Sequence, residues 1–133
     1  MGRSTYEDMA QMQKKRIPKN PKPGFEILTG RDSLVLSREE GYVAKGAGVY
    51  DNFRTAVESV DESKPIFILG GEKLFIEALP YTNMVFMTIV KGDYQCDKFF
   101  PIKYLTDKFE ISEGEELLPN DELAFVKYVR NKR

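Results

Sequence analysis

The spacing of apolar residues in this chain changes most sharply at paired glycines in the middle of the sequence. The continuous apolar run of residues 66–69 predicts a β-strand buried on both faces. After Gly70 and Gly71, apolar residues recur at helical spacing, at Leu74, Phe75, Ala78 and Leu79. Two glycines before a helix let a ligand approach the backbone, and the helix start offers N–H groups to an anion. The segment therefore predicts a nucleotide site, with a tight turn that needs glycine as the alternative.

Before the glycine pair, helical and extended patterns alternate. Thr5 and Asp8 have the spacing of a capping box, which predicts a helix from about Tyr6 to Lys15. Three prolines and a glycine within residues 17–24 prevent its continuation and predict an extended loop. Cations gather in and just before this loop, and we interpret them as a solvated surface. They are Lys14, Lys15, Arg16, Lys19 and Lys22.

Two short strands and a second helix follow the loop. Leu34–Leu36 predicts a short buried strand, and Gly46–Tyr50 predicts a second, weaker one. Asp51 or Asn52 then caps a helix. The apolar residues of this helix lie on one face, at Phe53, Ala56, Val57 and Val60.

The C-terminal part of the chain shows mostly extended patterns. Met84–Val90 is a long apolar strand in which Thr88 is the polar exception. Two more strands are predicted near Lys108–Glu115 and Leu123–Arg130, joined at Pro119-Asn120. Because strands and helices alternate through the middle and a hairpin closes the chain, we expect an α/β fold. Its mostly parallel central sheet would be flanked by helices and end in an antiparallel C-terminal hairpin.

Length and composition narrow the classes of protein. A chain of 133 residues suits a single domain over residues 1–133. The net charge of −1 gives no reason to expect nucleic acid, and no apolar run is long enough for a membrane span. The start of the chain does not resemble a signal peptide. Cys96 is the single cysteine and has no partner for an internal disulfide, so we expect a cytoplasmic protein.

The chain contains no histidine, which limits its chemistry. Catalytic units of the Ser-His-Asp or Cys-His type and the commonest zinc sites are excluded, and we expect no metal. Acid–base chemistry must come from carboxylates, lysine, tyrosine or water. Ligands of open α/β sheets bind beyond the carboxyl ends of the strands. The predicted site therefore lies at the loops after Leu36, after Leu69 and near Thr88.

Several short segments form a recognisable series along the chain. They are Met1-Gly2-Arg3-Ser4-Thr5-Tyr6-Glu7, Gly30-Arg31 with Leu34-Val35-Leu36-Ser37-Arg38, Ile66 to Phe75, and Met87-Thr88 with Asp97-x-Phe99-Phe100-Pro101. In their order and approximate spacing, these segments resemble the dihydrofolate reductase family. The resemblance covers nearly the whole chain, and the proline-rich loop before Gly24 is its main departure.

The resemblance implies that the chain is truncated at its N-terminus. In the family, an opening strand, a mobile loop, a first helix and another strand precede the Met-Gly-Arg segment. The first helix carries the carboxylate that helps to protonate the substrate, so the catalytic acid of this chain is unknown and its activity is expected to be impaired. Glu7 and Asp8 are not expected to replace this acid, because both suit the first turn of a helix.

The resemblance also implies an NADPH site. Arg3, Ser37 and Arg38 are candidates for the adenosine 2′-phosphate, because guanidinium groups and hydroxyls suit a dianionic phosphate. Arg38 alone would read as a surface arginine. Phe75 stands where the family often has tyrosine, so a hydroxyl near the nicotinamide is lost. In the family, the bond between the paired glycines is cis. The predicted cofactor-binding residues are Arg3, Ser4, Thr5, Leu36, Ser37, Arg38, Gly70, Gly71, Glu72, Lys73, Leu74 and Phe75.

A smaller group of residues is implied for the folate substrate. Arg31 would pair with its glutamate carboxylate, although it could equally be a turn arginine beside Asp32. Leu28 would line the pocket beside the aminobenzoyl ring, and Leu69 would face the pterin. Thr88 would hydrogen-bond the pterin amino group and the missing carboxylate, as the supporting partner of that acid.

Three functions are compatible with these residues. The first is reduction of 7,8-dihydrofolate to tetrahydrofolate with NADPH, with folate-like inhibitors as further ligands. The second is a non-catalytic NADPH-binding or structural module on a reductase fold. The third is a related pyrimidine reductase of riboflavin synthesis, against which Gly30-Arg31 argues. Exposed sheet edges favour pairing with another chain, so we also expect self-association.

Overall fold

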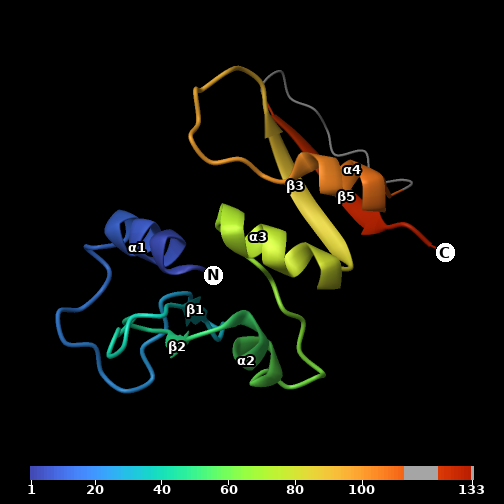
Figure 1. Ribbon diagram of the computed structural model, residues 1–133. Coiled ribbons are helices and arrows are strands. Elements are labelled where there is room, and N and C mark those ends of the chain that lie inside the picture. Colours follow the sequence, from blue (N-terminus) through green and yellow to red (C-terminus); the bar gives the residue numbers. More distant parts are fainter. Residues whose placement is uncertain (113–122, 133) are drawn as a thin grey trace. The chain divides into compact units, whose positions relative to one another are not determined.

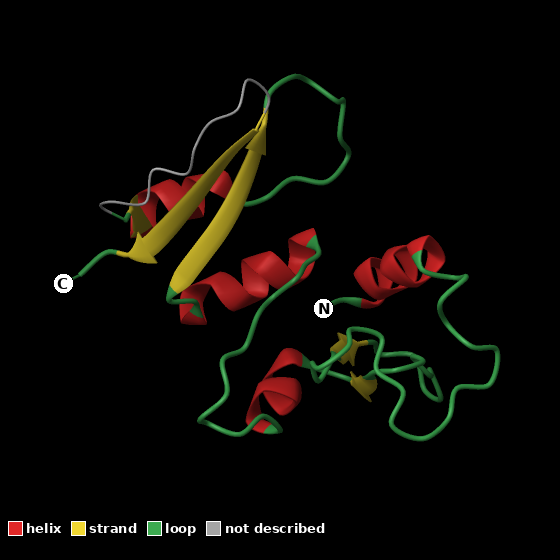
Figure 2. Cartoon of the chain, turned by 180° about the vertical axis from the view of Figure 1, so that it is seen from behind, coloured by secondary structure: helices red, strands yellow, loops and turns green. Residues whose placement is uncertain are grey.

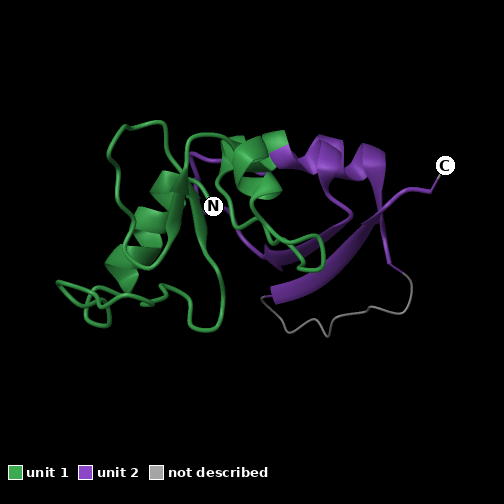
Figure 3. Ribbon diagram, turned by 90° about the horizontal axis from the view of Figure 1, so that it is seen from below, with its two compact units in different colours: residues 1–77 green, residues 78–133 purple. Residues whose placement is uncertain are grey.

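The computed structural model describes residues 1–112 and 123–132 of the chain (Figure 1). It divides into two compact units, Met1–Glu77 and Ala78–Arg133, which are coloured separately in Figure 3. Each unit contains a sheet and a buried apolar cluster of its own. The single domain expected over residues 1–133 stays a prediction.

The first unit is built around two short parallel strands, β1 and β2. β1 (Leu34–Leu36) pairs with β2 (Gly48–Tyr50), with Val35 opposite Val49. Three helices belong to this part of the chain, α1 (Arg3–Met12), α2 (Phe53–Glu58) and α3 (Glu72–Ala78), and the last of them runs into the second unit. Figure 2 shows the long loops between these elements. The strands at Leu34–Leu36 and Gly46–Tyr50 are thus confirmed, except that the second begins at Gly48.

The first helix begins earlier than the capping-box pattern predicted. α1 starts at Arg3 and ends at Met12, and Gly2 in extended conformation is its N-cap. The prediction that Thr5 caps the helix is wrong. Gly2 is held outside the helix because its amide donates to the carbonyl of Gly70 at 2.7 Å. This contact between residues distant in the sequence fixes the point at which the helix starts.

The second helix is capped as predicted. The side-chain oxygen of Asn52 accepts a hydrogen bond from the amide of Thr55 at 2.8 Å, which identifies Asn52, rather than Asp51, as the N-cap of α2. Ala56 is buried and Val57 is half-buried, so the predicted apolar face points inward. The helix ends at Glu58, before the last apolar residue of that face.

The core of the first unit joins the first helix to the strands. Tyr6, Ile27, Val35 and Ala44 form its buried cluster. Met9 and Ala10 of α1 pack against this cluster from one side, and Leu28 and Val49 pack against it as well. The tyrosine hydroxyl is satisfied inside the core, because it donates to the carbonyl of Lys45 at 2.8 Å.

The apolar run before the glycine pair does not form the predicted buried strand. Ile66, Phe67 and Leu69 are 44%, 68% and 48% exposed, and neither described sheet includes residues 66–69. A parallel strand is buried on both faces only where neighbouring strands and helices surround it. Among the described residues, the run meets such a neighbour only at its end, where Gly70 accepts the amide of Gly2.

The second unit is an antiparallel sheet in the order β3-β5-β4. Its strands are β3 (Met84–Val90), β5 (Leu123–Arg130) and β4 (Phe109–Ile111). The first two were predicted with these bounds, and β4 lies within the strand predicted near Lys108–Glu115. Thr88 lies opposite Phe125 in the register of the long pair. A 3-10 turn at Leu79–Tyr81 precedes the sheet.

One helix of the second unit was not predicted from the sequence. α4 (Ile102–Lys108) occupies residues just before β4 and includes the start of the strand predicted from Lys108. Leu105 of this helix, Leu79 and Phe109 form the buried cluster of the unit, and Val85 and Met87 of β3 pack against it. Part of the predicted strand near Glu115 and the turn at Pro119-Asn120 lie outside the described residues.

The α/β fold class is confirmed, with parallel and antiparallel strand pairs both present. In the described residues these pairs lie in two separate sheets, because the run at residues 66–69 does not pair into either of them. Within residues 1–112 and 123–132, the structure contains no helix that is both long and apolar enough to cross a membrane.

Candidate functional site

Three sequence segments meet at one edge of the first unit, where β1 and β2 end. On the side of β1 away from β2, Leu36 bonds to the carbonyl of Met1 at 2.9 Å and Gly2 forms a parallel bridge to Leu36. Gly2 in turn bonds to Gly70. The residues that follow, at Arg3, Ser37 and Gly71, therefore emerge side by side. The loops predicted to carry the site after Leu36 and after Leu69 therefore lie side by side, and the binding of a ligand there stays a prediction.

The paired glycines lie beside the start of α1. The Gly70–Gly71 peptide bond is cis, as the resemblance implied, and Gly70 has a φ of +115°. A Cβ atom on Gly71 would lie 3.5 Å from Oγ1 of Thr5, and one on Gly70 would lie 3.3 Å from the ring of Phe75. The segment is therefore closely packed between a hydroxyl and an aromatic ring.

Two helices begin next to this segment. The first turn of α1 is closed by the amide of Tyr6, which donates to the carbonyl of Gly2 at 3.1 Å. The three amides before it have no acceptor within the helix, and they belong to Arg3, Ser4 and Thr5. Glu72, Lys73 and Leu74 form the first turn of α3, which the amide of Phe75 closes by donating to Gly71. The N-terminal position of these residues is as predicted, whereas their contact with a cofactor stays a prediction.

A groove of about 550 Å³ lies at the end of β1 and β2. Ser37 and Arg38 line it. The other lining residues were not predicted as part of the site, and they are Glu39, Glu40, Gly41, Tyr42, Val49, Tyr50, Asp51 and Thr55. The amide of Ser37 donates to the carbonyl of Tyr50 at 2.9 Å, and Oγ of Ser37 accepts the amide of Glu39 at 3.2 Å. Two of the three residues predicted for the 2′-phosphate, Ser37 and Arg38, thus line the same groove.

The guanidinium of Arg3 is the centre of a charged cluster beside this groove. Its Nε donates to Glu7 at 2.8 Å and its Nη1 donates to Glu39 at 2.7 Å. The guanidinium carbon also lies 4.4 Å from the centre of the Tyr42 ring. The Tyr42 hydroxyl donates to Glu7 at 3.1 Å, so four side chains hold one another in place.

This cluster shifts the pKa values of its members. The hydrogen bond from Arg3, followed by that from Tyr42, lowers the pKa of the Glu7 carboxyl. Glu7 raises the pKa of Arg3 by accepting its hydrogen bond. Desolvation, and then the hydrogen bond to Glu7, raises the pKa of Tyr42. At neutral pH, Arg3 therefore stays cationic and Glu7 stays anionic.

The residues implied for the substrate are divided between the two units, with Leu28, Arg31 and Leu69 in the first and Thr88 in the second. Leu28 packs against the core, and Leu69 is half exposed. Arg31 is exposed in a turn, and its neighbour Asp32 pairs with Lys64 at 3.2 Å. Thr88 is exposed on β3 of the second unit, which is described separately. Their role in substrate binding stays a prediction.

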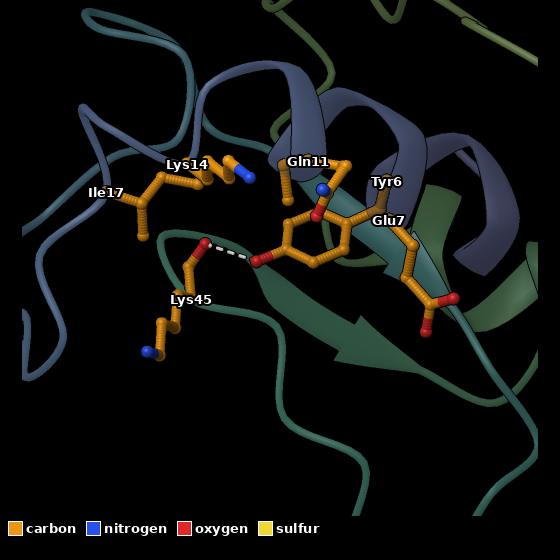
Figure 4. Close-up of a pocket in the computed structure, with 7 residues that line it drawn as sticks. Tyr6, Glu7, Gln11, Lys14, Ile17 and Lys45 are labelled. Atoms are coloured by element: carbon orange, nitrogen blue, oxygen red, sulfur yellow. Dashed lines mark hydrogen bonds between the residues drawn. The ribbon is translucent and has the colours of Figure 1, made fainter.

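A second cavity, of about 390 Å³, lies beside Tyr6 (Figure 4). Side chains of α1, the segment after it and Lys45 line it, namely Tyr6, Glu7, Ala10, Gln11, Lys14, Ile17 and Lys45. No sequence pattern predicts this cavity, because Tyr6 and Lys45 are brought together only by folding. Within residues 1–112 and 123–132, no three Cys, Asp or Glu side chains gather as a metal site.

Glu39 and Tyr42 were also missed as members of the charged cluster. Glu39 directly follows Arg38, and this adjacency was visible in the sequence. The pairing of Tyr42 with Glu7 joins residues 35 positions apart, and no local pattern reports such a contact.

Comparison with known proteins identifies the family of this chain. The sequence model of the family described as dihydrofolate reductase matches residues 23–130. A dihydrofolate reductase of Neisseria meningitidis is 28% identical over 132 residues, which are 98% of this chain and 73% of that protein. A solved dihydrofolate reductase from Enterococcus faecalis, complexed with NADP(H) and RAB-propyl, is similar with a TM-score of 0.72 and 22% identity, over 98% of this chain and 72% of that one.

Other relatives are matched over a smaller share of their length. A dihydrofolate reductase of Staphylococcus haemolyticus is 25% identical over 71% of this chain and 64% of that protein. The type A13 dihydrofolate reductase of Escherichia coli is 29% identical over 88% of this chain and 62% of that protein. The chain thus spans a little under two thirds of these two relatives. Since the family match covers most of its residues, the chain belongs to the dihydrofolate reductase family.

Proposed function

We propose that this chain serves in the NADPH-dependent reduction of 7,8-dihydrofolate to tetrahydrofolate. The observation that carries the proposal is the meeting of Gly2–Thr5, Leu36–Arg38 and Gly70–Gly71 at one edge of the first unit. These are the segments through which the resemblance implied cofactor binding. The E. faecalis relative, whose solved structure contains NADP(H), supports the same cofactor.

The residues at this edge fit a dinucleotide. Ser37 and Arg38 offer a hydroxyl and a guanidinium to the adenosine phosphate from within the groove. The first turn of α1 offers amides and the Thr5 hydroxyl to a pyrophosphate, next to the closely packed Gly70 and Gly71. When bound, NADPH supplies the reducing equivalent of the reaction. The side chains of this chain hold its phosphates and orient it.

The substrate side of the proposal rests on fewer contacts. We propose that Arg31 binds the glutamate carboxylate of the folate and that Leu28 and Leu69 contact its rings. Thr88 would hydrogen-bond the pterin amino group. No described carboxylate is assigned as the catalytic acid. We therefore still predict that the 133-residue chain turns over its substrate poorly.

A substitution in the groove tests cofactor binding. Arg38→Ala removes a phosphate partner, so we expect it to weaken NADPH binding about tenfold. Arg54→Ala is the matched control, because Arg54 is an exposed arginine of α2 that pairs with Glu58 and does not line the groove. Isothermal titration of NADPH into the purified chain measures both. Equal affinities of the two variants would contradict the placement of the cofactor.

We propose as a second function a module that binds NADPH without catalysis. The cofactor candidates gather at one edge of the first unit, and no described carboxylate is assigned as the catalytic acid. NADPH oxidation on adding dihydrofolate separates the two functions, since binding without oxidation supports the module. Methotrexate binding would in turn favour a folate site over a pyrimidine reductase site.

The expected partners and location complete the proposal. Self-association stays a prediction, and the exposed apolar side chains of Phe67 and Phe86 support it. We propose a cytoplasmic setting, in agreement with the free, exposed thiol of Cys96. Nothing in the net charge of −1 favours a nucleic-acid partner.

A further inference from the structure

We propose that Glu39 determines how strongly this chain discriminates between dinucleotides with and without a 2′-phosphate. Its carboxylate competes with that phosphate for the guanidinium of Arg3. This inference rests on the proposed function, because it requires the cofactor to bind beside Ser37 and Arg38. It adds a specificity-determining residue that the motifs did not indicate.

The charge of the groove is the first argument. Among the residues that line it, Arg38 is the cation, whereas Glu39, Glu40 and Asp51 are carboxylates. A dianionic phosphate entering the groove therefore meets more negative than positive charge. A further cation is needed to offset this repulsion, and Arg3 is placed to provide it.

The hydrogen bonds of Arg3 are the second argument. Its Nη1 is held by Glu39 at 2.7 Å, and its Nε is held by Glu7 at 2.8 Å. Glu7 lies one turn along the same helix and is also bound by Tyr42, so this pair stays in place. Glu39 lies in the loop after β1 and lines the groove. A phosphate that approaches Arg3 from the groove therefore competes with Glu39 for this guanidinium.

The chemistry of the ribose gives the direction of the effect. A free 2′-hydroxyl can donate a hydrogen bond to a carboxylate, and acidic residues commonly bind this hydroxyl in sites for unphosphorylated dinucleotides. A 2′-phosphate cannot donate in this way and is repelled. Glu39 thus favours NADH relative to NADPH, and removing its charge should increase the preference for NADPH.

Two charge-neutralising variants isolate this effect. Glu39→Gln removes the competing carboxylate, and Glu40→Gln removes an equal charge from the same groove. Glu40 makes no hydrogen bond or ion pair among the residues that the structure describes, so it controls for the general change in charge. Isothermal titration of NADPH and of NADH into the wild-type chain and both variants gives the affinities, and circular dichroism checks that all three are folded.

We expect Glu39→Gln to raise the affinity for NADPH about three- to tenfold above that of Glu40→Gln, with the affinity for NADH unchanged or lower. Equal effects of the two substitutions on NADPH, or an equal rise for both dinucleotides, would overturn the role of Glu39 and leave the proposed function standing. If neither dinucleotide binds any of the three proteins, the proposed function fails and the inference fails with it.

Discussion

At the scale of single residues, Gly46 leaves less room for a side chain than any other glycine that the structure describes. Its φ is +75°, and a Cβ atom there would lie 2.4 Å from the amide nitrogen of Ile27. That amide donates to the carbonyl of Gly46 at 3.0 Å, so the two segments are in direct backbone contact. Ile27 is almost fully buried in the core of the first unit. A side chain at residue 46 would therefore disturb the packing that supports β1.

We expect Gly46→Ala to lower the free energy of unfolding by about 3 kcal/mol, from strain at positive φ together with the backbone clash. Gly41→Ala is the control, because Gly41 has a φ of +76° and nothing within 4 Å of its Cβ position. It should cost about 1 kcal/mol. Urea unfolding measures both changes, and equal losses would show that the clash at Ile27 is relieved without cost.

At the scale of elements, the starts of α1 and α2 have different causes. A hydrogen bond from Gly2 to Gly70 fixes the start of α1, and its N-cap has no side-chain bond. The start of α2 is fixed locally, by the side chain of Asn52. Because Thr55 of α2 lines the groove, this cap also supports the proposed cofactor site.

Asn52→Ala should therefore destabilise the protein by about 1 kcal/mol, because the amide of Thr55 loses its acceptor. Asn52→Ser keeps an acceptor for that amide and, like alanine, loses the hydrogen bond that the Asn52 amide donates to Asp51 at 2.8 Å, so it should cost much less than alanine. The midpoint of urea unfolding reports the difference. A loss as large in the serine variant as in the alanine variant would contradict a capping role.

At the scale of the whole molecule, two buried clusters stabilise the chain. Tyr6, Ile27 and Val35 belong to the first, and Leu105 and Phe109 belong to the second. The single domain that the chain length predicts requires these clusters to unfold together. A substitution that destabilises one cluster should then also destabilise the other.

We expect Leu105→Ala, at a side chain with no exposed surface, to cost about 3 kcal/mol. In a single domain it should also speed hydrogen exchange at the amides of Leu36 and Ser37 in the first unit. Ile102→Ala on the same helix, at a side chain 51% exposed, is the control and should change little. Unchanged exchange in the first unit of the Leu105 variant would mean that the units unfold separately.

Local patterns predicted much of the chain correctly. The spacing of apolar residues located β1, β2, α2, α3, β3, β4 and β5, and the cap at Asn52 was among two adjacent candidates. These features depend on periodicity and on side-chain–backbone bonds a few residues long, which a sequence displays directly. The helix α4 was missed because its apolar residues are too few within Ile102–Lys108 to stand out.

The sequence by itself determined the α/β class, the family resemblance and the order of the segments that carry the proposed site. The tertiary structure decided where α1 begins, and it left Ile66, Phe67 and Leu69 exposed and residues 66–69 outside both described sheets. It also decided that Arg3 is held by both Glu7 and Glu39. Each of these depends on contacts between residues far apart in the chain. Such contacts arise from strand pairing and packing, whose partners no local spacing identifies.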